Sequence, residues 1–358
     1  MNHQEVQYWL QEQNEENLQT LWQRADRVRS ERVGDGVYLR GLVEISNYCV
    51  RRCAYCGLQA GNRRLQRYRL NEEEILQCVS EIEQLGIGTV VMQGGEDEGL
   101  DSAWIARIIR QIKTTTSLAV TLSLGERPID DLILWKEAGA DRYLLRFETS
   151  DRKLYQSIHP AYKDRVQHRL ELLPMIRTIG YEVGSGVMIG LPGQTYSSLA
   201  NDLLLFRQLD LDMIGVGPYI PHHETPLGRI QTQHSSEQVS NTELMTYKVI
   251  ALARLLCPEA NIPATTALST LNPESGHQVA LQRGANIVMP NITPAQKRTY
   301  YEIYPGKAGV KISFYEQGAL NQFYQKVRSI GRFIGTGIGS SPNYQMRHSV
   351  QFQSLQSV

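Results

Sequence analysis

Short apolar runs alternate with longer amphipathic segments from Tyr38 onward, and this alternation constrains the fold more than any other feature of the chain. The runs have the length of buried strands, and apolar residues recur at three- and four-residue spacings in the segments between them, which indicates helices. The expected strands cover residues 39–45, 89–92, 119–122, 142–145, 186–189, 213–216, 261–264 and 286–289. The expected helices cover residues 72–85, 103–113, 129–138, 166–179, 197–209, 244–256 and 277–283, with a last one near 295–301.

Eight such units have the number and rhythm of a (β/α)8 barrel, or TIM barrel. A doubly wound open sheet would alternate in the same way, but the chain has no glycine-rich dinucleotide fingerprint. Gly86, Gly139, Gly180 and Gly284 stand where expected helices end, at the position where a helix commonly needs a glycine cap. The sequence therefore predicts an α/β fold with a single closed barrel.

The barrel is expected to occupy residues 38–306 of the 358-residue chain, between two extensions. Residues 1–37 predict an N-terminal helical extension, because apolar residues recur among charges over 4–32. Residues 307–358 are rich in Gly, Ser and Gln and predict a partly irregular C-terminal tail.

Charge and composition narrow the class of partner and the compartment. Lys and Arg number 37 and Asp and Glu number 37, so no global charge favours nucleic acid or a membrane surface. No apolar run approaches the ~18 residues of a membrane span, and the polar start of the chain lacks the apolar core of a signal peptide. Five sparse cysteines indicate a reducing compartment, so we expect a cytoplasmic protein.

Three of the five cysteines, Cys49, Cys53 and Cys56, form a CxxxCxxC pattern directly after the first apolar run of the barrel. Thiolates at these spacings can bind three irons of a cubane iron–sulfur cluster and leave the fourth iron open to an outside ligand. Buried apolar cysteines, a structural zinc site and a disulfide framework are the alternatives. Zinc would need a fourth ligand, which is absent nearby in sequence, and disulfides fit an odd count of cysteines poorly.

Unusual polar residues follow every expected strand, at the end of a barrel where active sites lie. Gly94 and Gly95 allow backbone to approach a ligand closely, and Glu96 and Glu148 can accept from an ammonium or from hydroxyls. Each loop alone could instead be a turn or a helix cap. The other segments of this rim are 123–126, 146–149, 190–195, 218–225, 265–266 and 290–291.

Several charged residues near this rim have alternative roles. Arg142 and Arg146 lie on the same face of one expected strand, and in the barrel lumen they would need an anionic ligand or acidic partners such as Asp141 or Glu148. Arg169 begins a helix and could reach a carboxylate. The adjacent His222 and His223 are expected to pack a loop rather than share a metal. Arg63, Arg64, Arg67 and Arg69 form either a solvated face or a docking patch for an acidic electron carrier.

These motifs together resemble the radical S-adenosylmethionine (SAM) superfamily. Within it the chain is similar to the HydE-type maturases of FeFe-hydrogenase, with methylornithine synthase as a near relative. The segments that carry the resemblance are the cysteine loop and residues 44–47, 93–97, 121–126, 140–146, 190–195, 262–267 and 304–307.

The resemblance implies one 4Fe–4S cluster on Cys49, Cys53 and Cys56, and reductive cleavage of bound SAM to methionine and a 5′-deoxyadenosyl radical. It also implies two sets of contacts. The cofactor contacts would be Tyr55, Gly94, Gly95, Glu96, Ser123, Glu148 and Arg169, and the substrate contacts Arg142, Arg146, Thr265, Thr266, Tyr301 and Tyr304.

The implied substrate is a small molecule or an organometallic complex, with reduced flavodoxin or ferredoxin as electron donor and other hydrogenase maturases as further partners. One alternative is chemistry on an amino-acid-like substrate, as in methylornithine synthase or biotin synthase. Another is a non-catalytic iron–sulfur carrier. A carrier has no need for the Gly94-Gly95-Glu96 loop or for arginines in the lumen, so the sequence favours an enzyme.

Overall fold

The computed structural model describes residues 1–163, 168–230, 235–307 and 317–355 and forms a closed barrel of parallel strands. Six strands are hydrogen-bonded in the order β2-β3-β4-β5-β6-β8, and β10 pairs with β11. The circle is closed by two parallel bridges, Met213 to Asn261 and Leu42 to Asn291. The strands are β2 (Gly41–Ser46), β3 (Thr89–Gly94), β4 (Ala119–Ser123), β5 (Arg142–Leu144), β6 (Glu182–Ser185), β8 (Met213–Ile214), β10 (Pro263–Ala264) and β11 (Ile287–Val288). The predicted (β/α)8 barrel is confirmed.

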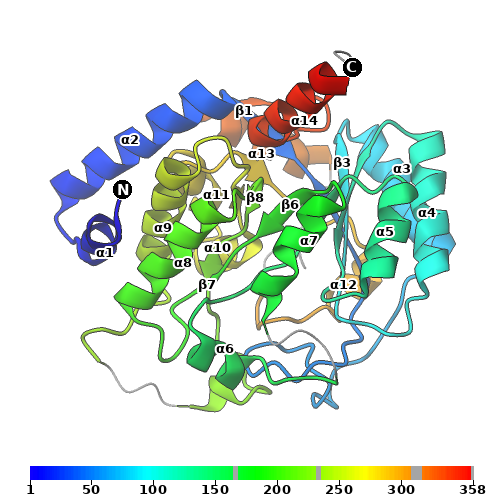
Figure 1. The fold of residues 1–358 in the computed structure, drawn as a ribbon, viewed down its shortest axis with the longest axis horizontal. Helices are drawn as coiled ribbons and strands as arrows, with labels where there is room; N and C mark the ends of the chain where they lie inside the picture. Colours follow the sequence, from blue (N-terminus) through cyan, green and yellow to red (C-terminus); the bar gives the residue numbers. More distant parts are fainter. Residues whose placement is uncertain (164–167, 231–234, 308–316, 356–358) are drawn as a thin grey trace.

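Helices surround the barrel because each buries an apolar stripe against it (Figure 1). On α3, for example, Ile75, Val79 and Ile82 are buried, and the side chain of Asn71 caps the first turn. The outer helices are α3 (Glu72–Gln84), α4 (Ser102–Thr115), α5 (Ile129–Glu137), α7 (Leu173–Thr178), α8 (Tyr196–Gln208), α9 (Glu243–Leu256), α10 (Thr266–Leu271) and α11 (Gly276–Leu281).

Shorter elements lie in the segments that follow the strands, and among them α6 (Arg152–Ile158), which follows β5, is at the lower side of Figure 1. The others are the single turns η1 (Arg169–Glu171), η2 (Leu227–Arg229) and α12 (Ala295–Arg298), and the paired strands β7 (Met188–Ile189) and β9 (Gly217–Pro218). The helix expected over 166–179 is therefore divided into η1 and α7, with Pro174 in the first turn of α7; its first residues lie outside the described part of the chain.

The N-terminal extension is helical as predicted, but it forms two helices. These are α1 (His3–Gln11) and α2 (Glu15–Val33), which pack against α8 and α9 (Figure 1). The break occurs at Asn14, whose side chain accepts from the backbone N–H groups of Glu16 and Asn17 and so begins a new helix. Strand β1 (Gly36–Leu39) then leads into the barrel.

The C-terminal segment is more regular than its composition predicts. It contains α13 (Gln317–Ser329), β12 (Phe333–Ile334) and α14 (Pro342–Leu355), and α14 lies at the end of the molecule opposite α6 (Figure 1). The turn between β12 and α14 closes the N-terminal end of the barrel. The carbonyl of Ile338 accepts from Thr89 Oγ1 at 3.0 Å, and that of Gly339 accepts from Asn261 Nδ2 at 2.9 Å. We call residues 335–341 the floor loop.

The floor loop also corrects the prediction for Arg142. This residue begins β5, at the N-terminal end of the barrel, and its guanidinium pairs with Glu182 at 2.6 Å and donates to the carbonyl of Ile338 at 2.9 Å. Arg142 is fully buried and does not line the cavity described below. The domain boundaries at residues 37 and 306 stay predictions. No helix in the described ranges has the length and apolar character needed to cross a membrane.

Candidate active site

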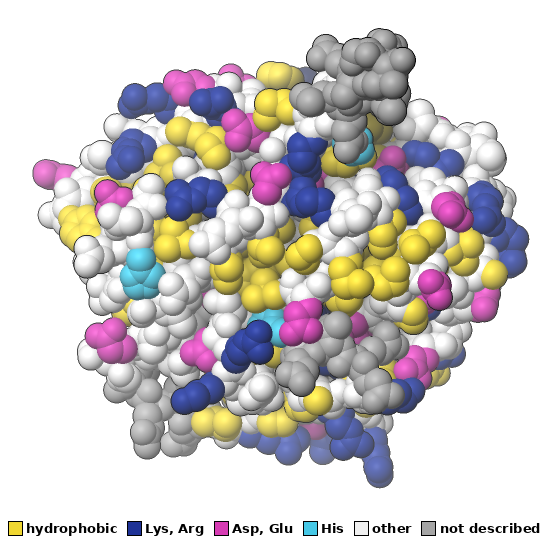
Figure 2. Space-filling model, viewed as in Figure 1, with side chains coloured by type: hydrophobic (Ala, Val, Ile, Leu, Met, Phe, Trp, Pro, Cys, Tyr) yellow, Lys and Arg dark blue, Asp and Glu magenta, His cyan; other side chains and the backbone are white. Residues whose placement is uncertain are grey.

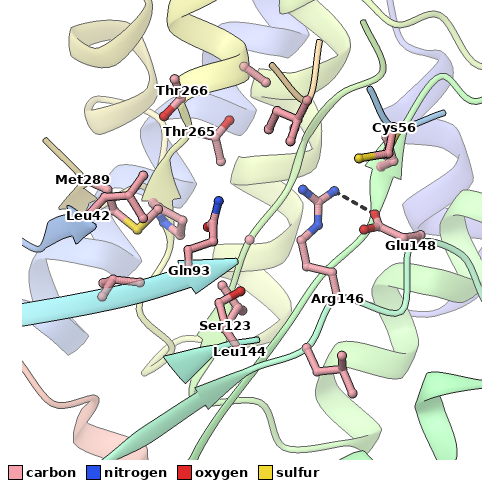
Figure 3. Close-up of a pocket in the computed structure, with 18 of the residues that line it drawn as sticks. Leu42, Cys56, Gln93, Ser123, Leu144, Arg146, Glu148, Thr265, Thr266 and Met289 are labelled. Carbon is pink, nitrogen blue, oxygen red and sulfur yellow. Dashed lines mark ion pairs between the residues drawn. The ribbon is translucent and has the colours of Figure 1, made fainter. Parts of the chain in front are cut away.

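A cavity of about 320 Å³ occupies the lumen at the C-terminal ends of the strands. Its mouth carries the cysteine loop, and its depth reaches Leu42, Met289 and Arg40 near the floor. In the close-up, Gln93, Arg146 and Thr265 approach the same open space from different strands and loops (Figure 3). A closed barrel produces this convergence because inward-facing residues of every strand share one lumen.

The cysteine loop is held in place by its backbone. The register between β2 and β3 shifts between Glu44 and Ser46, and this irregularity redirects the chain into the loop. Three hydrogen bonds then fix the loop, from Val50 N to Glu96 O, Ala54 N to Ile158 O and Gly57 N to Ile303 O, all between 2.8 and 2.9 Å. These bonds tie it to the loops after β3, β5 and β11.

Gly95 is required where β3 meets this loop. A Cβ at Gly95 would lie 2.2 Å from the carbonyl oxygen of Tyr48 and 2.8 Å from Cβ of Cys49. Such distances are shorter than any stable contact, so the close approach depends on glycine.

Cys49, Cys53 and Cys56 all line the cavity, and Cys53 is buried. Burial raises the pKa of all three thiols, that of Cys56 to about 12 and that of Cys53 well above its usual value. Three thiolates in this place therefore need a compensating positive charge, which the irons of a cluster would supply. Cys78, on α3, and Cys257, after α9, are buried outside the cavity. The donor set thus fits a cluster held by three cysteines.

A network of buried charges lies beside the cysteines. Arg169 donates to Glu96 at 2.6 Å and to Glu126 at 3.0 Å, and it also donates to the carbonyl of Arg146 at 3.0 Å. Arg51 lies 3.5 Å from Glu126 and 3.8 Å from Glu96. Burial lowers the pKa of Arg169, but the interactions with Glu96, Tyr55 and Glu126 raise it by more. The pKa therefore lies well above its usual value, and the guanidinium stays charged.

Side-chain atoms of Glu96, Glu126 and His159 come within 4.8 Å of one another, which is close enough for a metal ion. The two guanidinium groups of Arg51 and Arg169 already supply the positive charge that these carboxylates require. We therefore assign this cluster as a salt-bridge network rather than a metal site.

Arg146 and Glu148 face each other across the cavity wall, with Nη2 and Oε2 2.9 Å apart (Figure 3). Glu148 has a φ of +65°, which a residue with a side chain rarely adopts. Its backbone is held there by bonds from Glu148 N to Gly186 O and from Met188 N to Glu148 O, both 3.1 Å. The strained backbone aims the carboxylate into the cavity.

The depth of the cavity is polar on one side. Gln93 donates to the hydroxyl of Tyr301 at 3.3 Å, and Lys307 pairs with the buried Glu44. Burial raises the pKa of Tyr301, so its phenol stays protonated. The hydroxyl of Thr265 has no hydrogen-bond partner within the described chain. An unpaired buried hydroxyl favours a polar ligand at this position.

Most of the site residues named from the sequence meet in this one cavity, and Arg142 is the exception. The side chains of Arg142 and Arg146 were expected on the same face of one strand. Four residues along a strand span roughly 13 Å, so Arg142 lies at the floor and Arg146 near the mouth. The lining residues predicted from sequence are Cys49, Cys53, Tyr55, Cys56, Gly94, Gly95, Glu96, Ser123, Arg146, Glu148, Arg169, Thr265, Thr266, Tyr301 and Tyr304.

Other charged residues near the mouth have mixed roles. Arg67 donates to the carbonyls of Asn47 and Leu58, and Arg69 pairs with Asp97 at 2.7 Å, so both stabilise the cysteine loop. Arg63 and Arg64 are exposed. His222 packs its loop as predicted, since its Nδ1 accepts from the backbone of Glu224 at 3.0 Å, whereas His223 is exposed.

His159 was not predicted from the sequence, and Arg51, Glu126 and Lys307 were named only as parts of longer segments. His159 and Glu126 are 33 residues apart in the chain, and they meet because they follow β4 and β5, which are parallel neighbours in the sheet. For Arg51, the local signal of a role in the site was its position inside the cysteine motif.

Comparisons with known proteins agree with this geometry. Residues 43–206 match the model of the radical SAM superfamily. The chain is 44% identical over 289 residues to the FeFe-hydrogenase maturase subunit HydE of Thermotoga maritima, covering 81% of this chain and 80% of that protein. It is 28% identical over 290 residues to the 3-methylornithine synthase of Methanosarcina acetivorans, covering 80% and 78%.

The crystal structure of methylornithine synthase (PylB) shares the fold, with a TM-score of 0.75 at 23% identity over 93% of this chain and 94% of that one. These matches confirm the resemblance stated from the sequence. The chain belongs to the radical SAM superfamily and, within it, to the family of the hydrogenase maturase subunit HydE.

Proposed function

We propose that the protein binds a 4Fe–4S cluster on Cys49, Cys53 and Cys56, cleaves SAM reductively, and acts as a HydE-type maturase in assembly of the FeFe-hydrogenase active site. The observation that carries the proposal is the placement of three thiols at the mouth of a polar cavity inside a closed barrel. A bound cluster would supply an open iron for SAM and the electron that breaks one of its carbon–sulfur bonds.

The residues around the thiols have the chemistry to hold SAM. The loop of Gly94 and Gly95 lets backbone approach the amino acid end of the molecule, and the carboxylate of Glu96 can accept from its ammonium group. Glu148 can accept from ribose hydroxyls. Ser123 and Tyr55 complete this side of the cavity.

The deeper cavity has groups for a small substrate. Arg146 can bind a carboxylate of the substrate. Other acceptor atoms of the substrate can receive hydrogen bonds from the hydroxyls of Thr265, Thr266, Tyr301 and Tyr304. Both an organometallic complex of cysteine and a free amino acid carry such a carboxylate. The 28% identity to 3-methylornithine synthase therefore supports a second candidate, rearrangement of an amino-acid-like substrate.

An acidic one-electron carrier such as reduced flavodoxin or ferredoxin fits the outside of the mouth. Lys and Arg side chains are visible along the lower edge of Figure 2, on the side where the loops that follow the strands lie in Figure 1. Arg64, which follows the cysteine loop in the chain, has a side chain that is 81% exposed, although Glu224 partly neutralises its charge. Other maturases would be the remaining partners.

Cleavage of SAM tests the proposal directly. The protein is reconstituted with iron and sulfide without oxygen, reduced and mixed with SAM, and 5′-deoxyadenosine is measured. We expect Cys53→Ala to lower its formation at least 100-fold and Cys257→Ala, a matched buried cysteine, to leave it within twofold. Equal losses of product in the two variants would refute the assignment of the cluster ligands. A wild-type protein that carries a full cluster but forms no 5′-deoxyadenosine would refute the proposed enzymatic activity.

Two further measurements separate the substrates. Co-expression with an apo-hydrogenase and the other maturases should restore hydrogen evolution if the protein is a maturase. Conversion of lysine to 3-methylornithine by the purified protein, without such restoration, would support the second candidate instead.

A further inference from the structure

His159 lies directly against the sulfur of Cys53. Its Nδ1 is 3.0 Å from Sγ, and both side chains are buried. His159 is the C-terminal cap of α6, and the last residue of that helix, Ile158, accepts the backbone N–H of Ala54 at 2.8 Å. The end of α6 and the cysteine loop are therefore fixed relative to each other.

The other ring nitrogen determines which atom of the imidazole carries hydrogen. Nε2 lies 2.5 Å from Nη2 of Arg51, and a guanidinium can only donate. Nε2 must then accept, so the ring hydrogen is on Nδ1. Glu126 lies farther from Nε2, at 3.1 Å, and its oxygen accepts from Arg169 at 3.0 Å, so the shorter contact with Arg51 sets the tautomer.

We infer that His159 donates an Nδ1–H hydrogen bond to the sulfur of Cys53 and so raises the reduction potential of a cluster bound there. The inference rests on the function proposed above, because it requires the cluster. His159 touches a ligand and not the substrate, so it is a positioning residue.

The physical reason is the change of charge on reduction. One electron from a low-potential carrier would convert a bound 2+ cluster to the 1+ state, and part of the added negative charge would fall on the cysteine sulfurs. A hydrogen bond to sulfur becomes stronger as that charge grows, so it stabilises the reduced form more than the oxidised form. The hydrogen stays on Nδ1 throughout, and no proton is transferred.

Arg51 has the role of an outer support. It is buried, and it orients His159 from the side opposite the sulfur. Outer groups that fix a ligand's hydrogen bonds commonly tune a metal site in this way.

Two variants of nearly equal size separate the hydrogen bond from packing. His159→Leu removes the donor, whereas His159→Asn places an amide N–H close to the former position of Nδ1. His277→Leu is a matched control, because His277 packs against Phe323 on the outside of the barrel. The reconstituted proteins are titrated electrochemically, and the reduced cluster is quantified by electron paramagnetic resonance.

At equal applied potential, we expect His159→Leu to have a reduced-to-oxidised ratio at least tenfold below wild type, equivalent to 59 mV for one electron. His159→Asn should stay within threefold of wild type, as should His277→Leu. The reduced wild-type cluster should also show a coupling to an exchangeable proton that His159→Leu lacks.

Three results would overturn the inference. One is a fully loaded His159→Leu with the wild-type ratio, another is an asparagine variant that behaves like the leucine variant, and the third is loss of iron from both. If His159→Leu alone loses iron, the wild-type ratio in His159→Asn supports the inference. A wild-type protein that binds no cluster would instead refute the proposed function.

Discussion

Arg142 has partners for each of its guanidinium nitrogens. Glu182, the hydroxyl of Thr89 and the carbonyl of Ile338 surround it at 2.6 to 3.1 Å. Arg146, four residues later, is 30% exposed at the side chain and has an Nε without a partner in the described chain. One arginine is committed to the structure, and the other is available to a ligand.

We expect Arg142→Met to lower the free energy of unfolding by about 3–5 kcal/mol, because it leaves the carboxylate of Glu182 buried without its cation. Arg146→Met should lower it by no more than about 1–2 kcal/mol. Urea denaturation of both variants measures the difference.

Arg146→Met should still release 5′-deoxyadenosine from SAM but lose its dependence on substrate. Arg142→Met, assayed at a temperature where it is folded, should keep that dependence. Equal destabilisation by the two substitutions would contradict the assignment of Arg142 to the floor.

The limits of prediction at this scale follow from geometry. Spacing in the sequence identified the three cysteines, because their loop is local. It could not show that His159 faces Cys53, since the two are 106 residues apart and meet through the end of α6. It also placed Arg142 and Arg146 on one face without showing that the floor loop fills the lower end of that face.

Helix α8 is linked to the loop after β5 through one carboxylate. Asp202 is fully buried on α8 and accepts from the backbone N–H of Ser150 at 2.6 Å. Burial raises the pKa of Asp202 from 3.8 to about 7, although the hydrogen bonds from Ser150 oppose this change. The link therefore titrates close to neutral pH.

The sign of its effect on stability follows from proton binding. Between about pH 4 and pH 7 the folded protein holds a proton on Asp202 that the unfolded chain has released. The stability that this group contributes is complete below about pH 4 and is lost as pH rises through 7.

We expect Asp202→Asn to be more stable than wild type at pH 8 by about 1–3 kcal/mol, because the amide keeps the acceptor and carries no charge. The advantage should shrink toward pH 4. Thermal unfolding at several pH values measures it, with Asp130→Asn, at an exposed position on α5, as control. Parallel pH profiles for wild type and Asp202→Asn would contradict the raised pKa.

The helices and strands of the barrel were predictable because each has its own periodicity of apolar residues and its own residues that mark its ends. Gly86, Gly139, Gly180 and Gly284 have φ values of +69°, +108°, +100° and +114°, as expected of residues that end helices. The tail was not predictable in this way. At the floor it contacts the barrel through the carbonyls of Ile338 and Gly339, and a backbone carbonyl leaves no trace in residue type. Its ion pairs, from Arg347 to Asp210 and Asp212, join residues that are 137 and 135 positions apart in the chain.

At the scale of the whole molecule, the two ends of the chain complete the barrel. Helices α1 and α2 cover α8 and α9, and the floor loop fills the opening beneath β3, β5 and β6. Contact at the floor is close, since a Cβ at Gly88 would lie 2.0 Å from the carbonyl oxygen of Gly337. The floor loop is therefore packed directly against the barrel.

We expect Gly88→Ala to displace the floor loop and lower the free energy of unfolding by about 1–3 kcal/mol. Limited proteolysis should then cut the chain between residues 330 and 341 faster than in wild type. Gly318→Ala, where a Cβ would meet nothing within 4 Å, should not lower the free energy of unfolding and should leave the cleavage rate unchanged. An unchanged cleavage rate in Gly88→Ala would show that the floor is not held by this contact.

Within the described residues, the floor loop closes the N-terminal end of the barrel, and the cysteine loop stands at the opposite end. If SAM binds beside the cysteines as proposed, a molecule that reacts at depth would enter before SAM and its product would leave after methionine and 5′-deoxyadenosine. The shape of the barrel would thus set the order in which substrate and SAM bind and products leave, whatever the affinity of each molecule.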